Sequence, residues 1–318
     1  MPIPRAIVAV QDPETLDVAV TSGEEARVSA FDRSFHFGDS LYEVARSYRG
    51  ILFAFEDHVA RLRRSADLAH FEELPDLSAI ADIVRQASRA FFGRYGNVEV
   101  QVRTTISRGV GDVHIDRHSS GKPYAVVIVK ELKQLVSDEG PGTPPGPALR
   151  GQRWVVAQRR RNLVSALDPA MKSGNYLNSV LALAEAQSYG ADDALLLDHR
   201  GYATEGTTSN FFVVNRGEVW TAPLSVGILA GVTRAQVLET CRDLAIPVRE
   251  RLMSRYDLQH VEELFLSSST REVQPIVALD GRLVGDGEPG PVTRRLAAGL
   301  RERIERWCDF HGHESLWL

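Results

Sequence analysis

A single lysine, Lys172, lies just ahead of an amphipathic stretch in MKSGNYLNSVLALAEAQSYG, residues 171–190. A lone lysine is most often a solvated surface charge. The residues after it, SGNYLNS, are polar or small and favour a turn, and a helical period then begins near residue 177. We expect a helix that buries its apolar face and fixes Lys172 at the mouth of a buried helix. That face consists of Leu177, Val180, Leu181 and Ala184.

A carboxylate and two groups of hydrogen-bond donors follow later in the chain. Glu205 ends a predicted strand in GYATE, and its neighbour, residues 210–214, is apolar, so this carboxylate is expected at the edge of a core and needs a partner there. Gly231, Val232 and Thr233 stand at the start of a predicted helix, where free amides and a hydroxyl suit a phosphate. A further predicted strand, ELFLSSSTREV, ends in four consecutive hydroxyl residues, 267–270.

An amine, a buried carboxylate and a phosphate cradle are together what pyridoxal 5′-phosphate requires. The amine forms a Schiff base with the cofactor, and the carboxylate keeps the ring nitrogen protonated so that the ring can accept electrons. The cradle holds the phosphate. The sequence therefore indicates a pyridoxal phosphate site around Lys172 and Glu205.

Other cofactor and metal sites are disfavoured. The segment GDGEPG, residues 285–290, matches the GxGxxG pattern of dinucleotide sites. However, Asp286 and Glu288 would place carboxylates against a pyrophosphate, and Pro289 removes an amide donor. The nine histidines form no HExxH pattern, and we interpret HGH at residues 311–313 as a polar tail, so no metal site is expected.

Composition indicates a soluble globular protein, with 43% hydrophobic and 25% charged residues among 318. The 37 basic and 42 acidic residues give a formal charge of -5 without a basic block, so nucleic acid is not an expected partner. The N-terminus lacks a signal-peptide pattern and no apolar run could span a bilayer, so we expect no membrane partner and a cytoplasmic location. Cys241 and Cys308 form no CxxC pair and are expected to be reduced thiols.

Two α+β domains are expected, joined by the Pro/Gly-rich segment 137–151. The predicted domains are 1–136 and 152–318, and the second has more hairpins. The first is expected to contain a helix over 56–70 and strands within 97–109 and 123–132. Predicted strands of the second cover 153–158, 194–198, 201–205, 210–214 and 218–222, and its later helices cover 232–244 and 292–307.

Several segments, from about Phe31 to Leu296, carry motifs in an order that resembles one enzyme family. They are FHFGDSLYEVARSY, EDHVARL, KSGNYLNSVLALAEAQSYGADDALLLDHRGYATEGTTSNFFVV, GILAGVTRAQV and ELFLSSSTREVQPIVALDGRLVGDGEPGPVTRRL. These are similar to the class IV aminotransferases, fold type IV pyridoxal phosphate enzymes that include branched-chain aminotransferases, D-amino acid aminotransferases and aminodeoxychorismate lyases. The resemblance implies two mixed domains with the active site between them, and a homodimer with loops from both chains at each site.

The resemblance also assigns cofactor contacts. Arg61 in HVARL stands at the family's phosphate arginine, although periodicity alone does not distinguish it from Arg63 or Arg64. Tyr176 stands at the tyrosine that binds the cofactor's phenolic oxygen in branched-chain enzymes, but KSGNY is one residue shorter than their KAGGNY. The remaining implied residues are Lys172 for the Schiff base, Glu205 for the ring nitrogen, and Val232, Thr233, Ser268 and Ser269 for the phosphate.

Substrate choice rests on weaker similarities. Val113 and Ile115 occupy the places of the carboxylate-binding RxH pair of D-amino acid enzymes. Arg103 in VQVRTTISRG instead matches the arginine of the branched-chain pattern YIRPLIF, and Arg46 matches that of EGIR. In contrast, FGDSLYEV and SSSTREV are more similar to the D-amino acid and amine enzymes. The expected substrate-binding residues are Tyr42, Arg46, Arg103 and Thr270.

These similarities rank branched-chain-like transamination between an amino acid and a 2-oxo acid first. A D-amino acid or (R)-amine transaminase is second, and aminodeoxychorismate lyase is third. A further alternative is a protein of this fold that only binds a ligand. In that case the residues suited to the cofactor would have no catalytic role. A plainer interpretation of Arg103 is a solvent-facing charge on the same strand face as Glu99.

Overall fold

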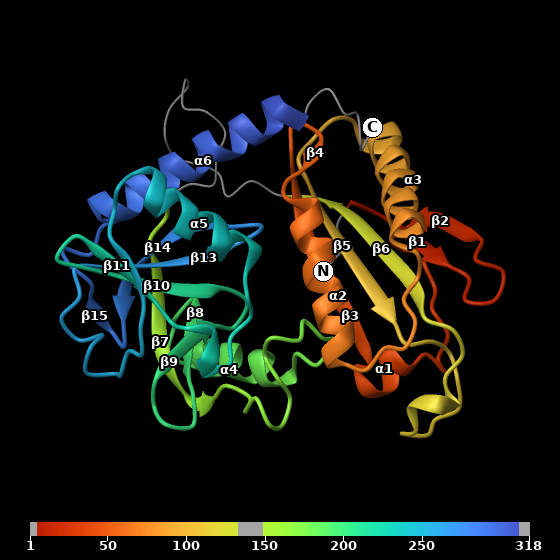
Figure 1. Ribbon diagram of the computed structural model, residues 1–318, viewed down its shortest axis with the longest axis horizontal. Coiled ribbons are helices and arrows are strands. Elements are labelled where there is room, and N and C mark those ends of the chain that lie inside the picture. Colours follow the sequence, from red (N-terminus) through yellow and green to blue (C-terminus); the bar gives the residue numbers. More distant parts are fainter. Residues whose placement is uncertain (1–4, 133–148, 312–318) are drawn as a thin grey trace. The chain divides into compact units, whose positions relative to one another are not determined.

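The computed structural model describes residues 5–132 and 149–311, which form two compact units (Figure 1). The first unit contains residues 5–132, 171–175 and 306–311, and the second contains 149–170 and 176–305. Both units mix helices and sheet, which agrees with the predicted α+β class. The expected connection, 137–151, lies almost entirely outside the described residues, so the domain limits at 136 and 152 stay a prediction.

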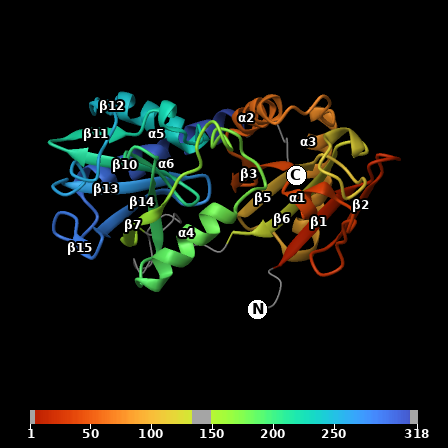
Figure 2. The ribbon, with the colours of Figure 1, turned by 90° about the horizontal axis from the view of Figure 1, so that it is seen from below.

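The first unit is built on a six-stranded antiparallel sheet (Figure 2). Within β5, Val100 and Val102 are buried while Gln101 and Arg103 are half-buried, as the predicted period of two requires. Val98 precedes the strand and is 38% exposed. The strands run in the order β2 (Val18–Ser22), β1 (Ala6–Gln11), β6 (Tyr124–Glu131), β5 (Val100–Ser107), β3 (Ser40–Tyr48) and β4 (Ile51–Leu52).

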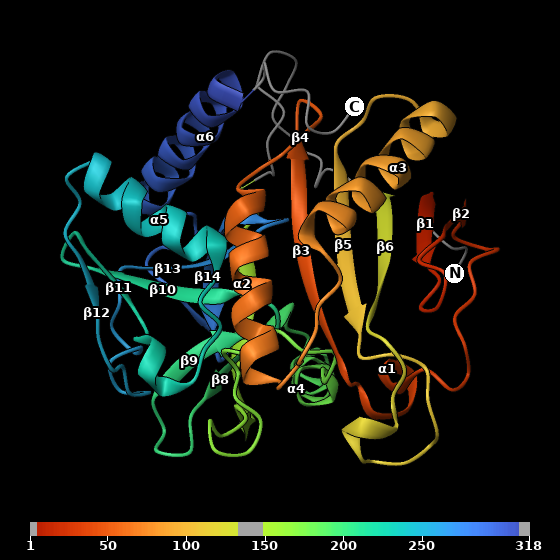
Figure 3. The same ribbon diagram turned by 45° about the vertical axis from the view of Figure 1, so that its right-hand side comes forward.

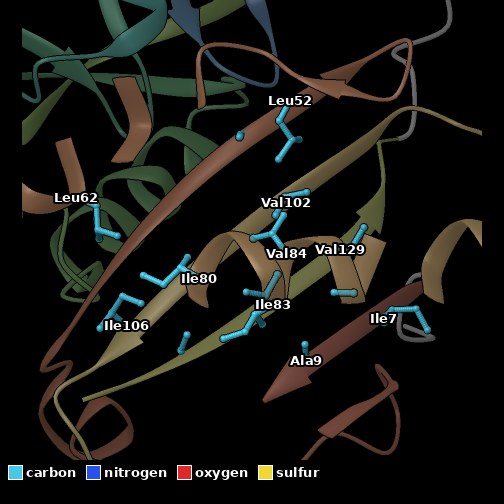
Figure 4. Packing of buried hydrophobic residues seen from close by; sticks show 14 of the residues in the cluster. Ile7, Ala9, Leu52, Leu62, Ile80, Ile83, Val84, Val102, Ile106 and Val129 are labelled. Carbon is cyan, nitrogen blue, oxygen red and sulfur yellow. The ribbon is translucent and has the colours of Figure 1, made fainter. Parts of the chain in front are cut away.

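Two long helices cover one face of this sheet. The predicted helix α2 (Phe55–Leu68) packs along β3, and α3 (Leu77–Tyr95) packs along β1 and β6 (Figure 3). Asp32 caps the short helix α1 (Arg33–Phe37), and Asp76 caps α3. The α3 helix is absent from the predicted elements, although its buried residues recur every three or four positions. Figure 4 shows the resulting core, which includes Ile7, Ala9, Leu52, Leu62, Ile80, Ile83, Val84, Val102, Ile106 and Val129.

In the second unit, six strands of a nine-stranded sheet form a closed ring. The ring closes where Glu205 of β9 pairs with Asn210 of β10. Trp154 and Phe211 stack within its core, with ring centroids 6.2 Å apart. The strands of the ring are β10 (Asn210–Asn215), β13 (Glu263–Ser268), β14 (Glu272–Leu279), β7 (Gln152–Arg160), β8 (Asp193–Leu197) and β9 (Ala203–Gly206), and β11 (Glu218–Thr221), β12 (Val248–Glu250) and β15 (Arg282–Leu283) extend the sheet.

Helix α4 (Leu177–Ser188) begins where predicted and lies against β7 and β8, but it buries the opposite face from the one expected. Its buried residues are small: Ser179, Ala182 and Ala186. Small side chains allow the helix to lie close to the sheet, and they pack with Ala157 and Ala194. The predicted burial of the apolar stripe is therefore wrong, since Leu177, Val180 and Leu181 are 69%, 56% and 38% exposed and Ala184 is also exposed.

The remaining helices are α5 (Val232–Asp243) and α6 (Pro291–His311), together with the 3-10 turns 117–119 and 224–226. The GDGEPG segment leads into α6, and the amides of Val292 and Thr293 at that helix start donate to the Glu263 carboxylate at 2.9 and 2.7 Å. A carboxylate therefore occupies the position that a pyrophosphate would need. Within residues 5–132 and 149–311, no helix is long and apolar enough to cross a membrane.

Candidate active site

Backbone hydrogen bonds join Lys172 to the rest of the first unit. Its N–H donates to Ser65 Oγ at 3.1 Å, and its carbonyl accepts from the Tyr42 N–H at 3.0 Å. The preceding residue, Met171, packs against the core of the same unit. The side chain is half-buried, and its Nζ lies 3.3 Å from Tyr42 Oη and 4.3 Å from the centroid of the Tyr42 ring. Lys172 is therefore not a solvated surface charge.

Tyr42 also contacts a second cation. The Arg103 guanidinium carbon lies 3.7 Å from the centroid of the same buried ring. Arg103 is paired with Val44 in the β3–β5 ladder, which places it on the same sheet face as Tyr42. Glu99, the partner considered in the plainer interpretation of Arg103, instead accepts from Ser47 Oγ. Each cation is attracted to the electron-rich faces of the ring.

Arg46 lies on this face too, since it is paired with Gln101. It is 5% exposed, and its guanidinium carbon lies 4.6 Å from the centroid of the Tyr48 ring. Three of the four expected substrate-binding residues therefore line one polar face of the first sheet, opposite the face that the helices cover. They are Tyr42, Arg46 and Arg103.

Arg61 is buried on the other face, whereas Arg63 and Arg64 are exposed. Its Nε and Nη2 donate to the Glu43 carboxylate at 2.8 and 2.6 Å. His58 Nδ1 lies 2.7 Å from the same carboxylate. The three side chains form a buried cluster between β3 and α2.

Glu205 is the centre of a hydrogen-bonded cluster in the second unit. Its Oε1 accepts from Arg161 Nε at 2.9 Å, and its Oε2 accepts from the Leu229 N–H at 3.1 Å and from Asn210 Nδ2 at 3.3 Å. The buried Glu205 carboxylate thus has several hydrogen-bond donors, and Arg161 supplies the opposite charge. Asn210 also donates to the Leu229 carbonyl at 3.0 Å, which joins the carboxylate to the segment that leads into α5.

The start of α5 lies beside this cluster. Gly231 is the residue before the helix, no side chain caps it, and the first helical residues are Val232 and Thr233, as predicted. A side chain at Gly231 would meet Asn210, because a Cβ there would lie 2.0 Å from Asn210 Oδ1. The first amides of a helix have no acceptor within the helix, so they can bind an anion.

The hydroxyl run 267–270 forms the end of β13 and the turn into β14. Ser267 is paired with Asn210, which brings this turn next to the Glu205 cluster. The Ser267 hydroxyl is buried and has no hydrogen-bond partner among the residues that the structure describes. Ser269 and Thr270 follow in the turn, and Tyr176 immediately precedes α4.

The predicted residues thus fall into two sets. Lys172, Arg61 and the polar face of β3 and β5 belong to the first unit, and Glu205, the start of α5 and the β13–β14 turn belong to the second. Tyr176 belongs to the second unit as well.

Comparison with known proteins decides the family. The family model for amino-transferase class IV matches residues 40–279. The chain is 32% identical to the D-alanine aminotransferase of Staphylococcus haemolyticus, covering 88% of this chain and 94% of that protein. It is 30% identical to the branched-chain-amino-acid aminotransferase of Salmonella typhimurium, with 86% of each covered. The chain belongs to the class IV aminotransferases.

Solved structures agree with this assignment. The branched-chain amino acid aminotransferase of Thermobaculum terrenum, in its pyridoxal phosphate form, superimposes with a TM-score of 0.80 at 25% identity, covering 95% of this chain and 94% of that one. That of Thermoproteus uzoniensis with norvaline gives a TM-score of 0.80 at 26% identity, with 94% of both chains covered. This class IV aminotransferase therefore has fold type IV and is a pyridoxal-phosphate-dependent transaminase.

The residues present fit that cofactor. The first unit offers the half-buried Lys172 amine, and the second offers the Glu205 carboxylate. The uncapped start of α5 and the buried Ser267 hydroxyl are donors suited to a phosphate. These are the kinds of group that an aldehyde, a pyridine nitrogen and a phosphate would need.

Sequence analysis missed three residues of these clusters: Glu43, His58 and Arg161. A signal for two of them is present in the sequence, because Glu43 interrupts the apolar positions Leu41 and Ala45 of β3, and a buried carboxylate needs a cation. His58 and Arg61 are three residues apart and so share a helix face. Nothing comparable distinguishes Arg161 from its neighbours in an arginine run.

The buried cluster shifts two pKa values. Burial opposes ionisation of Glu43, but the hydrogen bonds and charge of Arg61, with the His58 bond, lower its pKa from 4.5 to about 2. Burial is also the largest influence on His58, and it lowers the pKa of this imidazole in spite of the Glu43 carboxylate. Both groups have a folded-state pKa below the unfolded one, so both make the aminotransferase less stable as the pH falls.

We predict that the stabilising effect of Glu43 is lost in acid. Between its ordinary pKa of 4.5 and about 2, the unfolded chain binds a proton that the folded chain does not. The contribution of on the order of 3 kcal/mol is therefore complete above the unfolded value and disappears towards the folded one. The difference in free energy of unfolding between wild type and Glu43→Gln, measured by denaturant titration, should shrink as the pH falls from about 5 to about 3. Glu302→Gln, at an exposed position on α6, is the control, and a pH-independent difference for Glu43→Gln would contradict the prediction.

We also predict that Gly231→Ala weakens cofactor binding. The new Cβ would displace the Asn210 amide or the start of α5, at a cost of roughly 1–3 kcal/mol. Affinity of the cofactor-free chain for pyridoxamine phosphate should fall, as measured by titration calorimetry. Gly93→Ala in α3 is the control, since nothing lies within 4 Å of its added Cβ. Combining Gly231→Ala with Asn210→Ala should cost less stability than the two changes added together, and simple additivity would exclude the proposed clash.

Proposed function

We propose that this aminotransferase exchanges amino groups between branched-chain-type amino acids and 2-oxo acids, with Arg103 recognising the α-carboxylate. The observation that carries the proposal is the position of Tyr42, whose ring contacts both the Lys172 amine and the Arg103 guanidinium. A proton-transfer group and a carboxylate-binding group are then separated by a single aromatic ring. An α-amino acid needs this spacing, because its reacting carbon is bonded directly to its carboxylate.

Lys172 is proposed to move the proton. Pyridoxal phosphate, when bound, supplies an electron-accepting ring. The Lys172 amine takes the proton from the α-carbon of the donor and returns it at the cofactor's C4′ atom. Its neighbour Tyr42 holds the amine through the 3.3 Å contact with its hydroxyl.

The proposal assigns the cofactor contacts to residues of both units. Glu205, ordered by Arg161 and Asn210, would face the ring nitrogen. Tyr176 would bind the phenolic oxygen. The phosphate would be bound by Arg61, Val232, Thr233, Ser268 and Ser269.

Substrate recognition is assigned to the polar face of the first sheet. The planar fork of Arg103 can meet a carboxylate with two parallel hydrogen bonds. Arg46 and Tyr42 share its face, and Thr270 at the β13–β14 turn completes the proposed substrate set. A D-amino acid transaminase is the second candidate, favoured by the 32% identity to a D-alanine aminotransferase. Val113 and Ile115 stand against it, because these side chains cannot bind a carboxylate.

The proposal includes a homodimer. On α4 the apolar stripe of Leu177, Val180 and Leu181 is exposed in the single chain, and a second copy would remove it from water. A cytoplasmic location, expected from the sequence, also stays part of the proposal.

Lys172→Ala should abolish transamination while the chain stays folded and still binds pyridoxamine phosphate. The reason is that this position supplies the amine and does not fill the core. Single-turnover absorbance changes with an amino acid donor measure the reaction, and circular dichroism measures the fold. Lys122→Ala, an exposed position, should react like wild type. If borohydride still fixed the cofactor to the Lys172→Ala chain, the amine would have to be another lysine.

Arg103→Met should separate two kinds of donor. Charge-assisted hydrogen bonds to a carboxylate are worth about 1.5–3 kcal/mol, so kcat/KM for α-amino and 2-oxo acids should fall roughly tenfold to a hundredfold. Simple (R)-amines have no carboxylate, and their rates should change little. A panel of L-amino acids, D-amino acids and (R)-amines tests this, with Arg63→Met as the exposed control. An equal loss for acids and amines, or none for either, would remove Arg103 from the substrate site.

A further inference from the structure

One arginine of the second unit contacts the hydroxyl run directly. Arg271 is the last residue of the turn between β13 and β14. Both its backbone N–H and its side-chain Nε donate to Ser268 Oγ, each at 3.3 Å. The family resemblance assigns no role to Arg271, although Ser268 is among the proposed phosphate contacts.

The two bonds decide which way the Ser268 hydroxyl points. A serine hydroxyl has one hydrogen to donate and two lone pairs to accept with. When both lone pairs accept from Arg271, the hydrogen is directed away from the arginine and is free to serve another acceptor. A phosphate oxygen is such an acceptor, and a bond from a hydroxyl to an ionised oxygen is short and strong.

The far end of Arg271 is held by the rest of the unit. Its Nη2 donates to Thr208 Oγ1 at 2.9 Å, and its Nη1 lies 3.4 Å from the buried carboxylate of Asp193. Asp193 in turn accepts from Thr207 Oγ1 at 2.5 Å. The Asp193–Arg271 pair thus connects the β13–β14 turn to the loop that follows Glu205.

The turn needs such support because its backbone is strained. Glu272, which follows Arg271, has a φ of 54°, in the left-handed region that is unfavourable for a residue with a side chain. An anchored guanidinium beside it opposes relaxation of the turn.

We infer that Arg271 is a positioning residue for the cofactor phosphate, fixing the Ser268 hydroxyl as a donor. The inference rests on the proposed phosphate role of Ser268. Arg271 acts through Ser268, so its effect is specific to ligands that carry a phosphate.

The test compares pyridoxamine phosphate with pyridoxamine, two ligands that differ only in the phosphate and cannot form an imine with Lys172. Dissociation constants are measured by calorimetry or fluorescence on the full chain freed of cofactor. Arg271→Met should weaken pyridoxamine phosphate binding about tenfold and leave pyridoxamine binding unchanged. Arg282→Met, at an exposed position on β15, should alter neither constant.

Two further variants test whether Arg271 acts by orienting the Ser268 hydroxyl or only through its positive charge. Arg271→Lys keeps the charge but lacks the fork that reaches Ser268, Thr208 and Asp193 together, so it should also weaken pyridoxamine phosphate binding. The double variant Ser268→Ala with Arg271→Met should bind no more weakly than Ser268→Ala alone, because the arginine has no hydroxyl left to orient.

Three results would overturn the inference: wild-type affinity in Arg271→Lys, equal losses for both ligands in Arg271→Met, or additive losses in the double variant. A different result would contradict the proposed function. If Ser268→Ala bound pyridoxamine phosphate as wild type does, the phosphate role of Ser268 would itself be wrong. If Ser268→Ala weakened binding while Arg271→Met did not, only the inference about Arg271 would fall.

Discussion

The pairing of Glu205 with Asn210 closes the ring of strands in the second unit, and Glu205 is the carboxylate proposed to face the ring nitrogen of the cofactor. A buried carboxylate is tolerated only when its oxygens are satisfied, and here Arg161, Asn210 and the Leu229 amide do so. Asn210 is also paired with Ser267 and lies against Gly231. The closing pair therefore fixes the hydroxyl turn and the start of α5 relative to the carboxylate.

The sheet of the first unit has one apolar face and one polar face. Alternation along β3 and β5 directs apolar side chains towards α2 and α3, and it directs Tyr42 and Arg103 to the opposite face. Glu43 is the exception, since its carboxylate points to the helix side and is paired there with Arg61 and His58. Breaking such a pair leaves a buried charge, which links the stability of this unit to pH.

The sequence motifs predicted much of the candidate site. Lys172, Glu205, the start of α5 and the hydroxyl run were all identifiable because each combines a reactive or polar side chain with an apolar period or a helix start. Arg161 and Arg271 were not, because their partners are distant in sequence: Arg271 contacts Asp193, and Arg161 contacts Glu205. A charge that pairs across a fold looks the same in sequence as a charge that faces water.

Local sequence thus determined many of the elements, the family and the residue types of the candidate site, because periodicity, helix starts and hydroxyl runs act over a few neighbouring residues. Tertiary structure alone decided which face of α4 is buried and which charged residues are paired. In α4 the sequence favoured Leu177 and Val180, but the sheet accepts Ser179 and Ala182, whose small side chains allow close approach. Among three nearby arginines of α2, only Arg61 meets a buried carboxylate. Burial and pairing depend on what the rest of the chain brings alongside, and no local pattern contains that information.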